Sequence, residues 1–203
     1  IMKGIIVSGG AKTKREIVPS GTHLARCYSM IHIGTVEWEY QGEKKFTDKV
    51  RLSFELPNEM RTYGELEMPM SIDKEYTLSM HEKANLRKDL EMWRGKSFTM
   101  EELGQFDVTD LLGAACNLTV IHKTTKAGNE YATIGGLSAI TKGTKMPPQF
   151  NLSFIFNYHD NFDATWLDEQ PEWLKEQIKA TEEYTNKMNQ MEFADTDKDD
   201  LPF

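Results

Sequence analysis

The sequence is poor in the features that mark metal-binding, secreted and membrane proteins. Its two cysteines, Cys27 and Cys116, lie far apart and in no CxxC or Cys/His pattern. A structural zinc site is therefore not expected, and the cytoplasm is the expected compartment. No apolar run approaches the roughly 20 residues of a membrane helix, and the first residues do not resemble a signal peptide. We expect no membrane partner and no cofactor.

Signature motifs of common enzymes are also absent: the chain has no Walker loop, no GxSxG and no HExxH. The strongest catalytic candidate is "NYHDNF", where His159, Asp160 and Asp163 offer ligands of the kind a nuclease metal needs. No second His/Asp cluster accompanies it at a matching spacing. We interpret the stretch as a turn before a helix and expect no enzymatic activity. A metal-dependent nuclease remains the alternative.

Negative charge is unevenly distributed along the 203 residues, whose net charge is −8. From residue 157 onward there are 13 acids and 4 bases, a net of −9, so residues 1–156 carry the remaining +1. Such asymmetry indicates either a separate partner for each part or an acidic tail that competes with an anionic ligand.

Alternating apolar residues predict β-strands through most of the chain. In residues 22–33 one face holds Ala25, Cys27, Ser29, Ile31 and Ile33, and the other holds Leu24, Arg26, Tyr28, Met30 and His32. Residues 35–40 and 44–56 predict a hairpin whose second strand ends at Pro57. The core side of that second strand is formed by Val50, Leu52, Phe54 and Leu56. Later strands are predicted over 75–80, on either side of a turn at 126–129, and over 151–156.

Two segments predict helices. In "HEKANLRKDLEMWRGK" the residues Ala84, Leu86, Leu90 and Trp93 recur at helical spacing, and Gly95 occupies the C-cap position. Because Trp93 shares this spacing with Leu86 and Leu90, we interpret it as a core residue. Residues 165–190 predict an acidic helix that restarts at Pro171. The last residues have no periodicity and few apolar side chains, which is typical of disorder. The predicted parts are a domain with a basic N-terminal arm (1–156), an acidic helical extension (157–190) and a disordered acidic tail (191–203).

The order of elements points to a specific fold. Three strands, a helix and two strands are the order of the OB-fold, a five-stranded Greek-key barrel with its helix between the third and fourth strands. We therefore predict a mainly β protein with this fold, followed by a C-terminal helix and a flexible acidic tail.

The end of the chain, "DKDDLPF", resembles the acidic tip of single-stranded DNA-binding proteins (SSBs) through Asp199, Asp200, Leu201, Pro202 and Phe203. The body from about Pro19 to Ile140 resembles OB-fold SSB-like proteins of bacteriophages. The stretches that carry this likeness are "GTHLARCYSMIHIGT", "KVRLSFELP", "EYTLSMHEKANLRKDLEMWRGKSFT" and "LLGAACNLTVIH".

The resemblance implies protection of single-stranded DNA during phage replication or recombination. It also implies that the five tip residues recruit replication or recombination proteins. The strand sequences of cellular SSBs are not matched, so their tetramer does not carry over, and a homo-oligomer is left open. A protein-interaction adaptor that does not bind DNA is the second alternative.

Binding of single strands without sequence preference needs cations for phosphates and aromatic faces for bases. Candidates lie opposite the apolar stripes and on connecting loops. They are Arg26, Tyr28, His32, Trp38, Tyr40, Lys44, Lys45, Arg51, Lys123, Lys126, Tyr131, Lys142 and Lys145. For each ring the alternative is ordinary packing, and for each cation it is a solvated surface.

Overall fold

The computed structural model describes residues 16–199. Its strands are β1 (Gly21–Tyr40), β2 (Glu43–Tyr63), β3 (Leu66–Thr77), β4 (Ala115–Thr124), β5 (Glu130–Ser138) and β6 (Phe154–Phe156). Its helices are α1 (Asn85–Arg94), α2 (Met100–Leu103), the 3-10 helix η1 (Val108–Leu111), α3 (Ala164–Asp168), α4 (Glu172–Lys179) and α5 (Glu182–Asp199). The described chain is therefore mainly β, as predicted.

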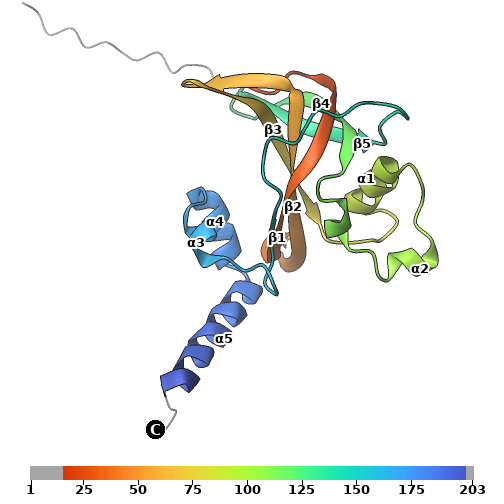
Figure 1. Cartoon of the computed structure of the whole chain (residues 1–203). Helices are drawn as coiled ribbons and strands as arrows, with labels where there is room; N and C mark the ends of the chain where they lie inside the picture. The colour runs from red at the N-terminus through yellow and green to blue at the C-terminus, as the bar shows by residue number, and fades with distance from the viewer. Residues whose placement is uncertain (1–15, 200–203) are drawn as a thin grey trace, which may run out of the picture.

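Five strands form one antiparallel sheet in the order β3-β2-β1-β4-β5. The sheet curls into a half-barrel, so β3 and β5 at its two ends come into contact. Helix α1, which follows β3 in the chain, packs against both of these strands (Figure 1). The predicted place of a helix between the third and fourth strands is confirmed.

The hairpin of β2 and β3 is longer than the sequence predicted. Strand β2 runs through Pro57 to Tyr63, so the predicted strand end is wrong. The predicted third strand exists, but β3 spans Leu66–Thr77 and not 75–80. Beyond Glu55, β2 pairs with β3 and no longer with β1. Pro57 lies at an irregularity of the remaining pairing, where its missing N–H interrupts no regular ladder.

The interior of the half-barrel is the main core. It contains Val50, Leu52, Phe54 and Leu56 of β2, together with Leu86, Leu90 and Trp93 of α1, as predicted. The Trp93 ring lies 5.5 Å from that of Phe54, and its indole N–H donates to the Ala115 carbonyl at 2.8 Å. The helix ends at Gly95, whose φ of 69° is the left-handed C-cap conformation.

The middle of strand β1 is buried on both faces. Its side chains Ala25, Cys27 and Met30 belong to the main core, whereas Ile31 and Ile33 belong to a second core on the outward face. The predicted single face from Ala25 to Ile33 is therefore wrong beyond Cys27. The step from Cys27 to Met30 spans three residues of β1, but the facing step on β2 spans two. A β-bulge supplies the additional residue and reverses the side-chain alternation.

The second core attaches the C-terminal part of the chain to the sheet. Strand β6 pairs in parallel with β1, and α3 and α4 lie over the same face (Figure 1). The core residues are Ile31, Ile33, Phe156, Tyr158, Leu167, Leu174 and Ile178. The Tyr158 hydroxyl donates to the Ile33 carbonyl at 2.7 Å. A new helix starts after Pro171, as predicted, and the acidic extension packs directly on β1.

The start of helix α5 is hydrogen-bonded to β1 through Glu183 and Thr35, a contact that we call the clasp. The Thr181 hydroxyl accepts the N–H of Tyr184 at 3.3 Å, which caps the helix. Glu183 accepts the Thr35 N–H at 3.0 Å and the Thr35 hydroxyl at 2.6 Å. This approach requires Gly34, because an added Cβ there would lie 2.9 Å from the Glu183 carboxylate.

Beyond this clasp α5 points away from the half-barrel (Figure 1) and continues to Asp199. The predicted disorder is therefore wrong for residues 191–199. The segment 182–199 contains no glycine or proline, and its first turn carries Glu182 and Glu183, which favour a helix N-terminus. The predicted tip residues Asp200, Leu201, Pro202 and Phe203 lie outside the described residues.

We expect Gly34→Ala to destabilise the protein by roughly 2–4 kcal/mol, because φ is +96° there and the new methyl displaces Glu183. Gly42→Ala is the matched control, since φ is +79° but no atom lies within 4 Å of an added Cβ. It should cost only the backbone strain, about 1 kcal/mol. Urea unfolding of both variants measures the difference, and equal losses would show that the clasp is unimportant.

The clasp should also depend on pH. Burial acts to raise the pKa of Glu183, but the hydrogen bonds from Thr35 outweigh it and hold the pKa below its ordinary value. A lowered folded pKa contributes stability above the unfolded value near 4.5 and loses it as pH falls through the folded value. The melting temperatures of wild type and Glu183→Gln should therefore differ at pH 6 and converge toward pH 3. The exposed Glu182→Gln should track wild type throughout, and a pH-independent gap for Glu183→Gln would contradict the clasp.

Candidate nucleic-acid interface

Five of the predicted cationic or imidazole groups are bonded within the chain: Arg26, His32, Lys44, Lys45 and Arg51. Arg26 donates to the Pro147 carbonyl at 3.0 Å. Arg51 donates to Asp73 at 2.6 Å and to Glu75 at 3.2 Å. The ring of Trp173 on α4 also lies 4.8 Å from the Arg51 guanidinium. These contacts make Arg26 and Arg51 poor candidates for phosphate binding.

The hairpin that joins β1 and β2 is acidic. Lys44 lies 2.8 Å from Glu37, and Lys45 lies 2.6 Å from Glu43. Such exposed pairs contribute little and exchange readily. However, residues 37–48 hold four acids and two bases, a net of −2, so the hairpin repels a polyanion overall. Its exposed rings, Trp38 and Tyr40, lie 6.0 Å apart on this acidic surface.

Four predicted lysines behave differently. Lys123, Lys126, Lys142 and Lys145 are exposed and have no ion-pair partner within residues 16–199. They lie in segment 112–150, which has four bases and a single acid, Glu130, and a net charge of +3. By contrast, residues 16–111 hold 12 bases and 18 acids, a net of −6, and residues 151–199 hold 4 bases and 12 acids, a net of −8. Of these three parts of the described chain, this segment alone has more bases than acids.

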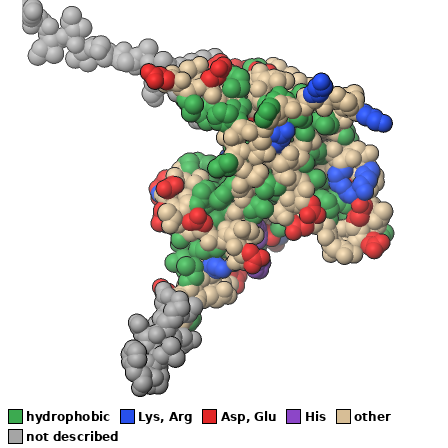
Figure 2. All heavy atoms as spheres, viewed as in Figure 1, with side chains coloured by type: hydrophobic (Ala, Val, Ile, Leu, Met, Phe, Trp, Pro, Cys, Tyr) green, Lys and Arg blue, Asp and Glu red, His purple; other side chains and the backbone are tan. Residues whose placement is uncertain are grey.

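The surface distribution follows the same division. On the side drawn in Figure 2, Lys and Arg side chains gather at the end of the molecule that carries β4, β5 and α1. Asp and Glu side chains lie at the β2–β3 turn, around α3 and α4, and also around α2, below the basic end. A polyanion therefore meets the least repulsion at the β4–β5 end.

The outward sides of β4 and β5 together form what we call the β4–β5 face. Its side chains are Asn117, Thr119, Ile121, Lys123, Tyr131 and Thr133. Lys123 and Tyr131 are directly opposite in the strand pairing, and the Tyr131 ring is 42% exposed. A cation and an accessible ring thus stand side by side, while the remaining outward side chains of the face are uncharged.

Two consecutive glycines, Gly135 and Gly136, leave part of β5 without side chains on this face. A Cβ on Gly135 would come within 3.1 Å of Ile121, whereas one on Gly136 would meet nothing within 4 Å. Glycine inside a strand often marks a place where another backbone approaches closely. The β4–β5 face therefore has room for a close approach of a ligand backbone at Gly136, whereas Ile121 fills the space beside Gly135.

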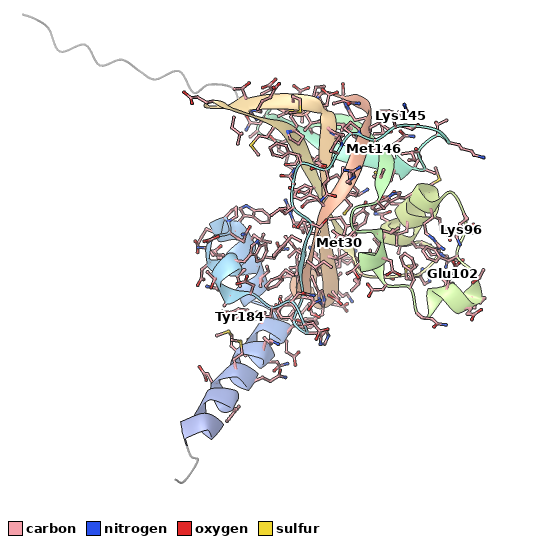
Figure 3. The ribbon with its side chains drawn as sticks, viewed as in Figure 1. Met30, Lys96, Glu102, Lys145, Met146 and Tyr184 are labelled. Carbon is pink, nitrogen blue, oxygen red and sulfur yellow. The ribbon has the colours of Figure 1, made fainter. Side chains whose placement is uncertain are left out.

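The loop between β5 and β6, residues 139–153, extends the face. It leaves the end of β5, crosses the outward side of the sheet and descends beside β1 to β6 (Figure 1). It carries Lys142 and Lys145, and Figure 3 shows Lys145 next to Met146 on this loop. Phe150 of the same loop is 49% exposed. Unpaired lysines thus lie at both ends of β5, Lys126 at its start and Lys142 at its end.

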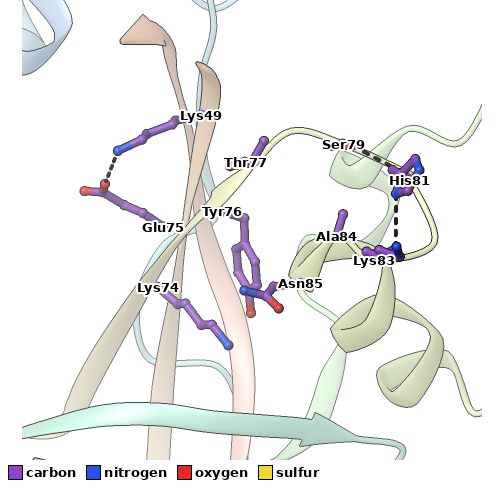
Figure 4. A pocket seen from close by; sticks show the side chains of 10 residues that line it. All are labelled: Lys49, Lys74, Glu75, Tyr76, Thr77, Ser79, His81, Lys83, Ala84 and Asn85. Carbon is purple, nitrogen blue, oxygen red and sulfur yellow. Dashed lines mark hydrogen bonds and ion pairs between the residues drawn. The ribbon is translucent and has the colours of Figure 1, made fainter. Parts of the chain in front are cut away.

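A second basic surface, which the sequence pattern missed, lies between β3 and the start of α1 (Figure 4). It is a groove of about 550 Å³ whose lining includes Lys49, Lys74, His81 and Lys83. The β2–β3 pairing brings Lys49 and Lys74 together, and the connection from β3 to α1 adds Lys83. Lys49 lies 3.8 Å from Glu75 and Lys74 lies 2.7 Å from Asp89. The groove is therefore partly neutralised, unlike the β4–β5 face.

The stretch "NYHDNF" forms the predicted turn. The side-chain oxygen of Asn157 accepts the N–H groups of His159, Asp160 and Asn161 at 3.0, 3.0 and 3.1 Å. The Asp163 carboxylate accepts the Trp166 N–H at 2.9 Å and caps α3. Within the part of the chain that the structure describes, no three His, Cys, Asp or Glu side chains are grouped so as to hold a metal ion.

Comparison of the chain with protein-family models, curated proteins and solved structures gives no match. Among residues 16–199, no helix is both long and apolar enough to cross a bilayer. The function is therefore inferred from the geometry and charge of this chain.

The structure separates two predicted aromatic residues by their role in stability. Tyr28 is half-buried, and burial raises the pKa of its hydroxyl, with a further rise from Asp73. We expect Tyr28→Ala to lose about 1–3 kcal/mol in urea unfolding. Trp38 is 46% exposed, with an N–H bond to Thr47 at 2.7 Å, and Trp38→Ala should stay within about 1 kcal/mol of wild type. A reversed order would mean that the positions of these two rings are misassigned.

Proposed function

We propose that this protein is an OB-fold single-stranded DNA-binding protein that holds the strand on its β4–β5 face. The observation that carries the proposal is the group of four unpaired lysines, Lys123, Lys126, Lys142 and Lys145, in a segment of net +3 within a chain of net −8. Exposed lysines that find no carboxylate in so acidic a protein are available to phosphates, and a basic stripe along one face is the footprint of nucleic-acid binding.

Single strands are favoured over duplexes because the face also presents rings. Tyr131 stands opposite Lys123, and Phe150 is exposed on the loop that carries Lys142 and Lys145. Stacking on such rings is worth about 1–3 kcal/mol per base, and the bases of a duplex are not accessible for it.

The half-barrel supports the OB-fold assignment through its strand order and the place of α1. OB-folds bind nucleic acids on the face of strands 2 and 3 and through the loops between strands 1 and 2 and between strands 4 and 5. Here Arg51 on the outward side of β2 is held by Asp73, Glu75 and Trp173, and the β1–β2 hairpin is acidic. The loop between β4 and β5 is the remaining member of that set, and it carries Lys126.

The resemblance to phage SSBs supports a proposal for the role of the protein in the cell. The protein coats and protects single-stranded DNA during bacteriophage replication or recombination, in the host cytoplasm, without catalysis or a cofactor. The tip from Asp199 to Phe203 recruits a replication or recombination protein, with Phe203 as its apolar anchor.

We expect replacement of all four unpaired lysines by glutamine to lower poly-dT affinity at least 30-fold at 50 mM salt. The slope of log affinity against log salt should flatten by about 0.7 for each phosphate that a lysine no longer neutralises. The matched control replaces Lys44, Lys45, Lys175 and Lys179, which are ion-paired, and so makes the same change in net charge. It should lower the affinity less than threefold. Fluorescence anisotropy over a salt series measures both.

Equal losses in the two quadruple variants would show that binding follows net charge and not the β4–β5 face. Absence of poly-dT binding by wild type would refute the DNA-binding function and favour the adaptor alternative. Degradation of the strand on addition of Mg²⁺ or Mn²⁺ would favour the nuclease alternative.

A further inference from the structure

One fully buried carboxylate holds the β5–β6 loop in place. Glu55, on the outward side of β2, is 0% exposed. Its oxygens accept the Phe150 N–H at 3.2 Å, the Asn151 N–H at 2.8 Å and the Asn151 side-chain amide at 2.9 Å. A buried carboxylate is very costly unless it is hydrogen-bonded and paired, so these bonds fix the loop strongly.

Arg26 supplies a second anchor at the same place. Its guanidinium donates to the Pro147 carbonyl at 3.0 Å and lies 4.0 Å from Glu55. The loop is therefore bonded both to the buried Glu55 and to the partly buried Arg26 beside it. Arg26 was predicted to contact DNA, but here it contacts the loop.

The anchored stretch follows closely after the loop lysines in the chain. Pro147, bonded to Arg26, is two residues beyond Lys145, and Phe150 is itself an exposed ring at 49%. A loop that is already ordered loses less conformational entropy when a ligand binds. We propose that Glu55, together with Arg26, is a positioning residue that fixes the β5–β6 loop so that Lys142, Lys145 and Phe150 meet the DNA strand. This inference depends on the proposed function.

The test uses two effects of Glu55→Gln that change DNA affinity in opposite directions. Removing a negative charge from a protein that binds a polyanion strengthens binding if charge alone matters. Loosening the loop weakens it. We expect Glu55→Gln to lower poly-dT affinity five- to tenfold. The NH2 group of the new glutamine cannot accept hydrogen bonds from the N–H groups of the loop, so the loop is held less firmly. The control is Glu39→Gln, an exposed hairpin acid with the same change in charge, which should bind at least as tightly as wild type.

A second readout needs no DNA. Trypsin cleavage after Lys142 and Lys145, followed by mass spectrometry, should be at least tenfold faster in Glu55→Gln than in wild type or Glu39→Gln. Cleavage after Lys123 and Lys126 should not change, which separates a loosened loop from global unfolding. If Glu55→Gln does not fold, Asn151→Ala removes one of the three N–H bonds and should shift both readouts in the same direction by a smaller factor.

Unchanged cleavage after Lys142 and Lys145 would overturn the anchoring. Faster cleavage with unchanged or increased affinity would overturn the positioning role. If neither wild type nor any variant binds DNA, the proposed function fails and the role in DNA binding fails with it. The cleavage rates then still decide whether Glu55 anchors the loop.

Discussion

Strand β1 must bury both of its faces, and the rest of the structure depends on the bulge that allows this. The additional residue between Cys27 and Met30 keeps Met30 in the half-barrel and turns Ile31 outward. Strand β6, α3 and α4 then have an apolar surface to cover, and α5 starts from the clasp on Thr35. Because these elements occupy the outward side of β1, the outward sides of β4 and β5 are left exposed.

The charges are arranged to match this uncovered surface. Cations on the helix-covered part of the sheet, such as Arg51, are paired with neighbouring carboxylates, and those on the acidic hairpin have partners as well. The β4–β5 face has a single acid in its segment, Glu130, which lies 3.4 Å from His122. An acidic protein can therefore present one surface to a polyanion, provided that the C-terminal helices stay on β1 and away from β5.

Patterns within one element were predictable from the sequence, and contacts between distant elements were not. The helical spacing of Leu86 and Leu90 identified α1, and simple alternation identified the core side of β2. Alternation failed on β1 because one bulge reverses it. From the sequence, the four lysines were four of thirteen candidate residues and could not be distinguished from the rest, because no local pattern shows which cations are ion-paired. Alternation placed Glu55 on the outward side of its strand but could not show its burial, because its partners lie about 95 positions later in the chain.

Mapping of the contact itself is the most direct test of the proposed interface. Ultraviolet cross-linking of oligo-dT to wild type, followed by peptide mass spectrometry, locates the rings that meet the bases. The β4–β5 face predicts cross-links at Tyr131 and Phe150, and their disappearance when the salt concentration is raised. Cross-links confined to Trp38 and Tyr40 would place the strand on the β1–β2 hairpin and contradict the interface proposed for this protein.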